Sequence, residues 1–180
     1  LGLARDVWFG AESVTLLGQA ARLSIMSTVA ESPASPGDRI TRLRTKQLAG
    51  AAVAVLNHDG DPDALIDFAD RCRDAGLDLP LFAPVPFVAD TETARTLQHF
   101  PGLQLPAGLI AAVSTASDPW NEGLRWTHHQ ASALAASGRF AGINLSGGTT
   151  SPDPARRLDL TTDFASTALD AWGANSVTTH

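Results

Sequence analysis

Residues 46–86 read KQLAGAAVAVLNHDGDPDALIDFADRCRDAGLDLPLFAPVP, and this stretch decides the fold class. A run of apolar residues, 52–56, stops at Asn57, and a helix-like segment over 62–75 separates it from a second apolar run, 79–83. Short apolar strands that alternate with helices indicate a parallel sheet buried on both faces. Ligands of such sheets bind at the carboxyl ends of the strands, so we expect chemistry at Asn57 and just after the second run.

The same alternation extends over the rest of the chain. An α/β barrel and an open doubly wound sheet both fit it. Segment 109–116 is ambiguous between strand and helix, and 151–157 is predicted to be a loop. The predicted strands are 1–5, 23–29, 52–57, 80–85 and 140–145, and the predicted helices are 11–21, 39–48, 62–75, 91–99, 118–136 and 161–172.

Composition excludes several classes of protein. The chain has 180 residues, enough for one domain with a sizeable core. A net charge of −6 disfavours a nucleic-acid partner, because phosphate neutralisation needs clustered Lys and Arg. The single cysteine, Cys72, rules out an intramolecular disulfide and fits a reducing compartment, so we expect a cytoplasmic protein. No apolar run reaches the roughly 18 residues of a membrane span, and no membrane partner is expected.

The first residues suggest where the sequence begins in its domain. The chain opens with Leu1 in an apolar run rather than with Met and a polar lead-in. We therefore expect residues 1–180 to form a single α/β domain that begins partway through and lacks its first strands. The oligomeric state is left open by the sequence.

Three polar residues follow predicted strands. Asp6 is a helix cap or turn residue, or else a general acid or electrostatic partner. Glu31 is either a solvated loop residue or a carboxyl that transfers a proton once burial raises its pKa. Asn57 is either a turn residue or an amide that offers a donor and an acceptor to the edge of a heterocycle.

The segment Gly147–Gly148–Thr149 follows the last predicted strand. Glycines let the backbone approach a ligand, and free N–H groups with hydroxyls suit a phosphate or ribose. A plain turn is the alternative. No metal site is expected, because the run 58–61 lacks the spacing of a calcium loop and the adjacent His128 and His129 diverge on a helix.

Four segments in register resemble the methylenetetrahydrofolate reductase family. They are Lys46–Gln47–Leu48–Ala49–Gly50–Ala51, Asp70–Arg71–Cys72 with Ala75–Gly76–Leu77–Asp78, Val85–Pro86 with Val88, and Leu105–Pro106–Ala107. The segment Leu1–Asp6 also resembles a family strand that ends in Leu-Arg-Gly-Asp.

The resemblance implies a (β/α)8 TIM barrel, of which this chain holds about strands four to eight. It also implies an enzyme that reduces 5,10-methylenetetrahydrofolate to 5-methyltetrahydrofolate with NADH or NADPH. The strand with the family's catalytic Glu lies upstream of Leu1 in this comparison.

The same resemblance implies functional roles for individual residues of this sequence. Asp6 matches an Asp near the flavin, and Lys46 matches a Lys near the flavin phosphates. Asn57 and Thr93 stand where the family has Gln residues, so they are the implied substrate-binding residues. With Asp6 and Glu31 as catalytic residues and Gly147, Gly148 and Thr149 at the cofactor, these form the predicted site.

Other family features are missing. Residues 26–30 replace the Tyr and His that contact flavin, and Gly147–Gly148 replaces an Asn-Arg pair. These departures weigh against bound FAD and favour direct hydride transfer from the nicotinamide. Two alternatives stay open: a catalytically inactive folate-binding or regulatory barrel, and a tetrahydrofolate-dependent methyl-transfer enzyme.

Overall fold

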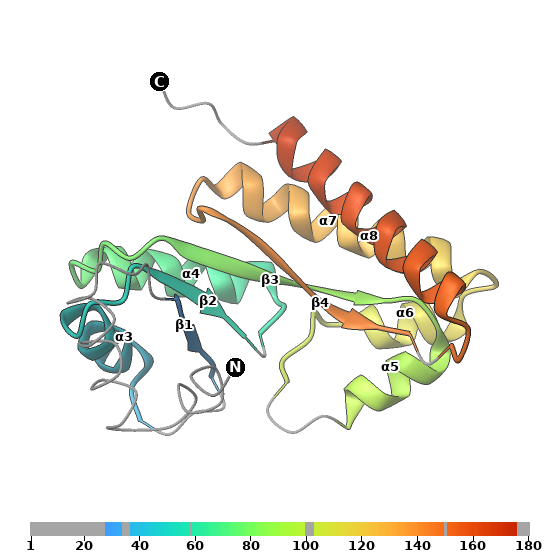
Figure 1. The fold of residues 1–180 in the computed structure, drawn as a ribbon, viewed down its shortest axis with the longest axis horizontal. Coiled ribbons are helices and arrows are strands. Elements are labelled where there is room, and N and C mark those ends of the chain that lie inside the picture. The colour runs from blue at the N-terminus through green and yellow to red at the C-terminus, as the bar shows by residue number, and fades with distance from the viewer. Residues whose placement is uncertain (1–27, 34–36, 58, 100–102, 150, 176–180) are drawn as a thin grey trace.

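The structure, a computed structural model, describes residues 28–33, 37–57, 59–99, 103–149 and 151–175 (Figure 1). Its strands are β1 (Thr28–Glu31), β2 (Val53–Leu56), β3 (Leu81–Val88) and β4 (Gly142–Gly148). Its helices are α3 (Arg39–Leu48), α4 (Pro62–Asp74), α5 (Thr91–Gln98), α6 (Leu109–Thr115), α7 (Pro119–Ser137) and α8 (Pro154–Asn175). The predicted α/β class is confirmed.

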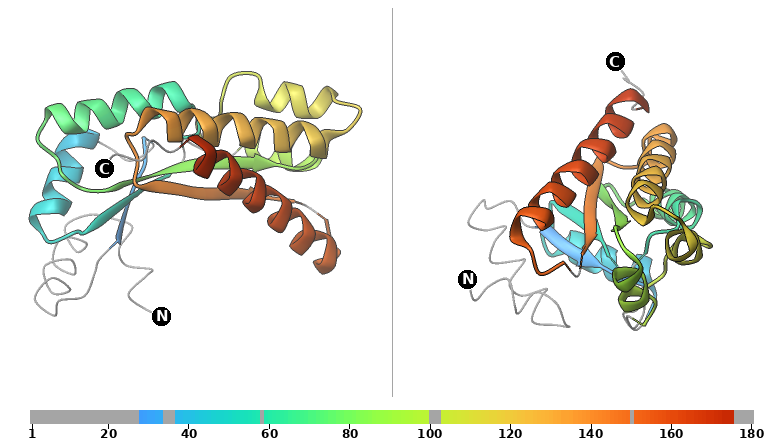
Figure 2. Two further views of the ribbon diagram at one scale, coloured as in Figure 1. Left: turned by 90° about the horizontal axis from the view of Figure 1, so that it is seen from above. Right: turned by 90° about the vertical axis from the view of Figure 1, so that its right-hand side faces the viewer.

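The described strands form one parallel sheet in the order β1-β2-β3-β4. A doubly wound sheet reverses its strand order at a switch point, whereas a barrel keeps sequence order. The described sheet contains no such reversal, so it is consistent with part of an α/β barrel. Helices α4 and α7 lie one after the other along one side of the sheet (Figure 2).

Aspartates set the starts of the helices. The side chains of Asp38, Asp61, Asp90 and Asp118 each accept a hydrogen bond from a backbone N–H in the first turn of α3, α4, α5 and α7. Such caps satisfy N–H groups that have no partner inside the helix. These four predicted helix starts are therefore confirmed.

Helix α8 corrects the prediction for the C-terminal part of the chain. The segment predicted as a loop over 151–157 is helical from Pro154, because Asp153 Oδ1 accepts from the Ala155 N–H at 2.9 Å. Proline fits the first helical position, where an N–H would lack a partner in any case. The helix also continues through Gly173, which was predicted to end it, and the ambiguous segment 109–116 is helix α6.

Strand β3 continues to Val88, beyond residue 85, where the sequence predicted its end. The carbonyl of Pro80 accepts from Ala54 of β2, whereas the carbonyl of Leu81 accepts from Ala141 before β4. Because successive residues of a strand face opposite neighbours, Pro84 and Pro86 turn their nitrogens toward the β2 side. Strand β2 pairs only with the first residues of β3, so the missing proline N–H groups leave no ladder bond unmade.

Two halves of the core meet along β3. The larger cluster lies between the sheet and α3 and α4, and it includes Ala83 and Val85 of β3. Phe87 packs instead with residues of α8, and Val88 packs with residues of α6. Within the described residues, none of the helices has the length and apolar character that crossing a bilayer requires.

Candidate functional site

The carboxyl end of β1 holds a buried ion cluster. Glu31 is the last residue of β1 rather than a loop residue, and its side chain is 0% exposed. Its carboxylate accepts hydrogen bonds from Arg42 and from Lys46 Nζ, the latter at 3.0 Å, and Lys46 Nζ also donates to the Ala30 carbonyl. Both cations come from α3, so the carboxylate points at the helix layer and is fully engaged there. Glu31 and Lys46, predicted for catalysis and cofactor binding, therefore bind each other.

The loop after β2 carries a second buried pair. Asp59 is 2% exposed, and its Oδ2 accepts from Arg39 Nη1 at 3.2 Å. The Arg39 guanidinium lies over the Phe68 ring, 3.9 Å from its centroid. Burial raises the pKa of the Asp59 carboxyl, and the charge of Arg39 opposes this only in part. Asp59 Oδ1 and Arg39 Nε and Nη2 have no hydrogen-bond partner among the described residues.

Asn57 lies next to this pair at the end of β2. Its backbone N–H donates to the Glu31 carbonyl at 2.7 Å, which extends the β1–β2 ladder by one residue. Its half-buried side chain makes no hydrogen bond within the part of the chain that the structure describes. The amide is thus available to a ligand, and ligand contact by Asn57 stays a prediction beside the alternative of a turn residue.

A cavity of about 370 Å³ opens at the carboxyl ends of β3 and β4. Its walls come from the loops after both strands and from the first turns of α5, α7 and α8. This is the place where parallel α/β sheets bind ligands. The lining residues are Ala89, Asp90, Thr91, Glu92, Trp120, Thr149, Ser151, Arg156 and Leu160.

Asp90 ties the two strand-end loops together across this cavity. Its Oδ1 accepts from the Thr93 N–H at 2.7 Å and so caps α5, and its Oδ2 accepts from the Thr149 hydroxyl at 2.8 Å. Thr149 Oγ1 in turn accepts from the Ser151 N–H at 3.1 Å. The loops after β3 and β4 are therefore held at a fixed separation before any ligand arrives.

An aromatic group also lines the cavity. Trp120, in the first turn of α7, packs against Phe164 with ring centroids 6.5 Å apart. The guanidinium of Arg156 lies over the Trp120 ring, 5.4 Å from its centroid. The lining thus holds two carboxylates, Asp90 and Glu92, and one guanidinium, Arg156. This arrangement suits a flat ligand with hydrogen-bond donors at one edge and an anionic group at the far end.

No protein-family model and no curated protein matches this sequence. A solved structure shares the fold. It is an uncharacterized protein from Clostridium thermocellum that binds two copies of 5-methyl-5,6,7,8-tetrahydrofolic acid. The TM-score is 0.61 at 15% sequence identity, and the match covers 87% of this chain and 56% of that one. The present chain therefore spans little more than half the length of this structural neighbour.

The structure divides the predicted site residues between two places. Thr149 lines the cavity, and Thr93 lies beside it in the first turn of α5, with its hydroxyl buried and without a hydrogen-bond partner among the described residues. Glu31, Lys46 and Asn57 lie at the ends of β1 and β2 instead. Asp6 lies outside the described residues.

The two predicted glycines belong to β4 rather than to a loop after it. Gly147 pairs with Phe87 of β3, and a Cβ on Gly147 would lie 2.1 Å from the Phe87 carbonyl oxygen. The strand pairing alone therefore requires glycine at this position. A Cβ on Gly148 would meet no atom within 4 Å. Their predicted role at a cofactor phosphate stays a prediction, and the carboxylates of Asp90 and Glu92 nearby work against it.

Sequence reasoning predicted chemistry in the loop that ends at Asp90, which lines the cavity, but it missed Trp120 and Arg156. The signal that could have found them is the Asp-Pro pair at residues 118–119 and again at 153–154. Each pair marks a helix start, and helix starts after parallel strands lie at the ligand-binding edge of the sheet. In the described part of the chain, no group of three or more His, Cys, Asp and Glu side chains is placed to hold a metal ion.

Proposed function

We propose that this chain binds a reduced folate in the cavity between the carboxyl ends of β3 and β4. The observation that carries the proposal is that Trp120, with the Arg156 guanidinium over its ring, lines the same cavity as the carboxylates of Asp90 and Glu92. The pterin of a folate is flat and presents N–H donors along one edge, and its glutamate tail ends in carboxylates. The folate bound to the structural neighbour supports the same ligand class.

The test is calorimetric titration of the protein with 5-methyltetrahydrofolate. Arg156→Gln should weaken binding about tenfold, because a charge-assisted hydrogen bond to the ligand is worth roughly 1.5 kcal/mol. Arg157→Gln is the matched control, since Arg157 is the next residue of α8, is exposed and does not line the cavity. The proposal fails if the protein takes up no folate, or if both variants bind as the wild type does.

We further propose that the bound folate is a substrate, 5,10-methylenetetrahydrofolate, that NADH or NADPH reduces without FAD. The in-register family motifs of residues 46–107 support this reading, as does the sequential parallel sheet, which fits strands four to eight of an eight-stranded barrel. Asp6 and Glu31 are the proposed catalytic residues, and Glu31 acts only after its carboxylate releases Arg42 and Lys46. Lys46, Gly147, Gly148 and Thr149 are the proposed cofactor contacts.

The reductase proposal predicts that the protein consumes NADH or NADPH only when methylenetetrahydrofolate is present. The purified protein should lack the flavin absorbance at about 450 nm that oxidised flavin rings give. Folate binding without oxidation of NADH or NADPH would contradict the reductase activity and favour a folate-binding or regulatory barrel. Oxidation that proceeds equally without folate would contradict the substrate.

A further inference from the structure

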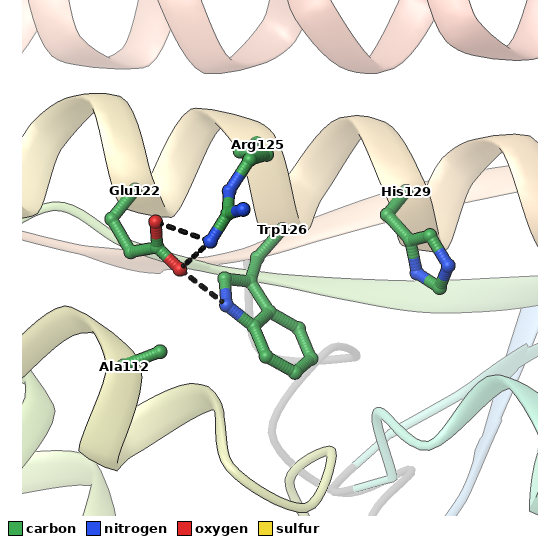
Figure 3. Close-up of a pocket in the computed structure, with 5 residues that line it drawn as sticks. All are labelled: Ala112, Glu122, Arg125, Trp126 and His129. Atoms are coloured by element: carbon green, nitrogen blue, oxygen red, sulfur yellow. Dashed lines mark hydrogen bonds and ion pairs between the residues drawn. The ribbon is translucent and has the colours of Figure 1, made fainter.

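A second hollow, of about 400 Å³, lies on the helix layer between α6 and α7. Its lining includes Ala112 of α6 and four residues of α7, which are Glu122, Arg125, Trp126 and His129 (Figure 3). The spacing of three and four residues places these side chains on one stripe of the helix. Its volume falls in the range of small-molecule sites. It is built from helix side chains, whereas the cavity described above is built from strand-end loops.

One carboxylate fixes the geometry of this hollow. Glu122 accepts from Trp126 Nε1 at 3.0 Å and from Arg125 Nη2, and its side chain is 15% exposed (Figure 3). The hydrogen bond to Arg125 lowers the pKa of Glu122, so the carboxylate remains charged at neutral pH. The indole is held at its N–H edge and its ring borders the open space. A wall that is fixed before binding costs a ligand little ordering entropy.

Around the hollow, the side-chain groups that have no hydrogen-bond partner among the described residues are mainly donors. Arg125 is 74% exposed and uses only Nη2, so its Nε and Nη1 have no partner among the described residues. His129, one turn further along α7, is exposed and makes no hydrogen bond within the same described ranges. Glu122, by contrast, already accepts from two side chains. The hollow therefore combines an apolar aromatic wall with a donor-rich rim.

We propose that this hollow binds a flat aromatic carboxylate, with its ring against Trp126 and its carboxylate on Arg125 and His129. A cationic ligand would meet Arg125 with the same charge. A dianion such as an aryl phosphate would be repelled by Glu122 more strongly than a monoanion is. A planar carboxylate matches the planar guanidinium and carries a single charge.

The test uses 1-naphthoate as the probe and follows the indole N–H signals by NMR. The chain has four Trp residues, and Trp126→Phe identifies the signal of Trp126. We expect 1-naphthoate to shift the Trp126 signal saturably. The uncharged 1-naphthylmethanol, which keeps the ring and lacks the carboxylate, should bind about fivefold more weakly, the value of a partly exposed ion pair.

Arg125→Gln should bring the two probes to equal affinity. The Arg125 side chain is exposed, and the dispersion of the same NMR spectrum checks that the variant is folded. Arg73→Gln is the matched control, because it removes a similar exposed i,i+3 pair with Asp70 on α4. The proposal is overturned if the Trp126 signal does not move, if the alcohol binds as tightly as the acid, or if the two Arg variants behave alike.

Discussion

At the scale of single residues, Gly147 and Gly148 are neighbours with different surroundings. Gly147 has φ +150°, and its α-carbon faces the backbone of Phe87 so closely that a Cβ would overlap the carbonyl oxygen. Gly148 has open space around its α-carbon. Glycine is therefore required at position 147 by the packing of β4 against β3, whereas at position 148 the packing does not require it.

Gly147→Ala should lower the free energy of unfolding by about 2–4 kcal/mol, the sum of backbone strain and overpacking. Gly148→Ala should change it by less than about 1 kcal/mol. Urea unfolding of both variants measures the two effects. Equal stability of the two variants would show that β4 shifts away from β3 at little cost.

Asp59 makes stability depend on pH. Burial raises the pKa of its carboxyl above the ordinary 3.8, so the folded protein binds this proton more tightly than the unfolded chain does. The contribution of Asp59 to the free energy of unfolding therefore falls as pH rises above 3.8 and levels off above the raised pKa. Asp59→Asn removes this titration.

We expect the free energy of unfolding of the wild type, minus that of Asp59→Asn, to fall as the pH rises above 3.8 and to level off above the raised pKa. Urea unfolding of both proteins across this range gives the difference directly. A difference that grows with pH would mean that the attraction of Arg39 outweighs the cost of burying the carboxylate.

At the scale of elements, β3 shows how a strand accommodates proline. Pro84 and Pro86 occupy positions whose backbone nitrogens face away from β4, whereas Val85 between them faces β4 and pairs with Leu145. Proline removes no ladder hydrogen bond where the backbone nitrogen faces away from β4. Where the nitrogen faces β4, proline breaks the β3–β4 ladder.

Val85→Pro should therefore cost about 3 kcal/mol or more of unfolding free energy. Pro84→Ala should cost no more than about 1 kcal/mol, the value of a more flexible unfolded chain. Thermal unfolding compares the two variants with the wild type. A mild Val85→Pro variant would show that the β3–β4 ladder adds little to stability.

Local chemistry explains which elements the sequence predicts. An Asp side chain caps a helix through atoms at most three residues away, so the starts of α3, α4, α5 and α7 are readable from the sequence. The end of β3 is not, because it depends on how far β2 extends beside it. The site divides in the same way: Thr149 lies in a local Gly-Thr signal, whereas the approach of Arg156 to Trp120 depends on the packing of α8 near α7.

At the scale of the whole molecule, the two core halves have different relations to the proposed folate. The cavity is lined by the loops after β3 and β4 and by α5, α7 and α8, but not by β1, α3 or β2. The ion pairs of Glu31 and Asp59 lie in the other half. Ligand binding should therefore stabilise one half more than the other.

Hydrogen exchange with and without 5-methyltetrahydrofolate tests this. We expect slower exchange in residues 87–92, 119–124 and 147–157, because opening of these segments must release the ligand. Residues 28–57 should exchange at unchanged rates. Protection confined to 28–57 would instead place the folate at Asn57 and Asp59.

The prolines of β3 also affect the tendency of the sheet to aggregate edge to edge. Beyond the end of β2, that side of β3 offers carbonyl oxygens but lacks N–H donors at residues 84 and 86. A foreign strand that added itself there would find two successive donors missing, so edge-to-edge pairing along this line is disfavoured. Both prolines are also buried, and Gly60 of the loop after β2 lies against Pro86, so this side of β3 is closed both by its missing donors and by the chain itself.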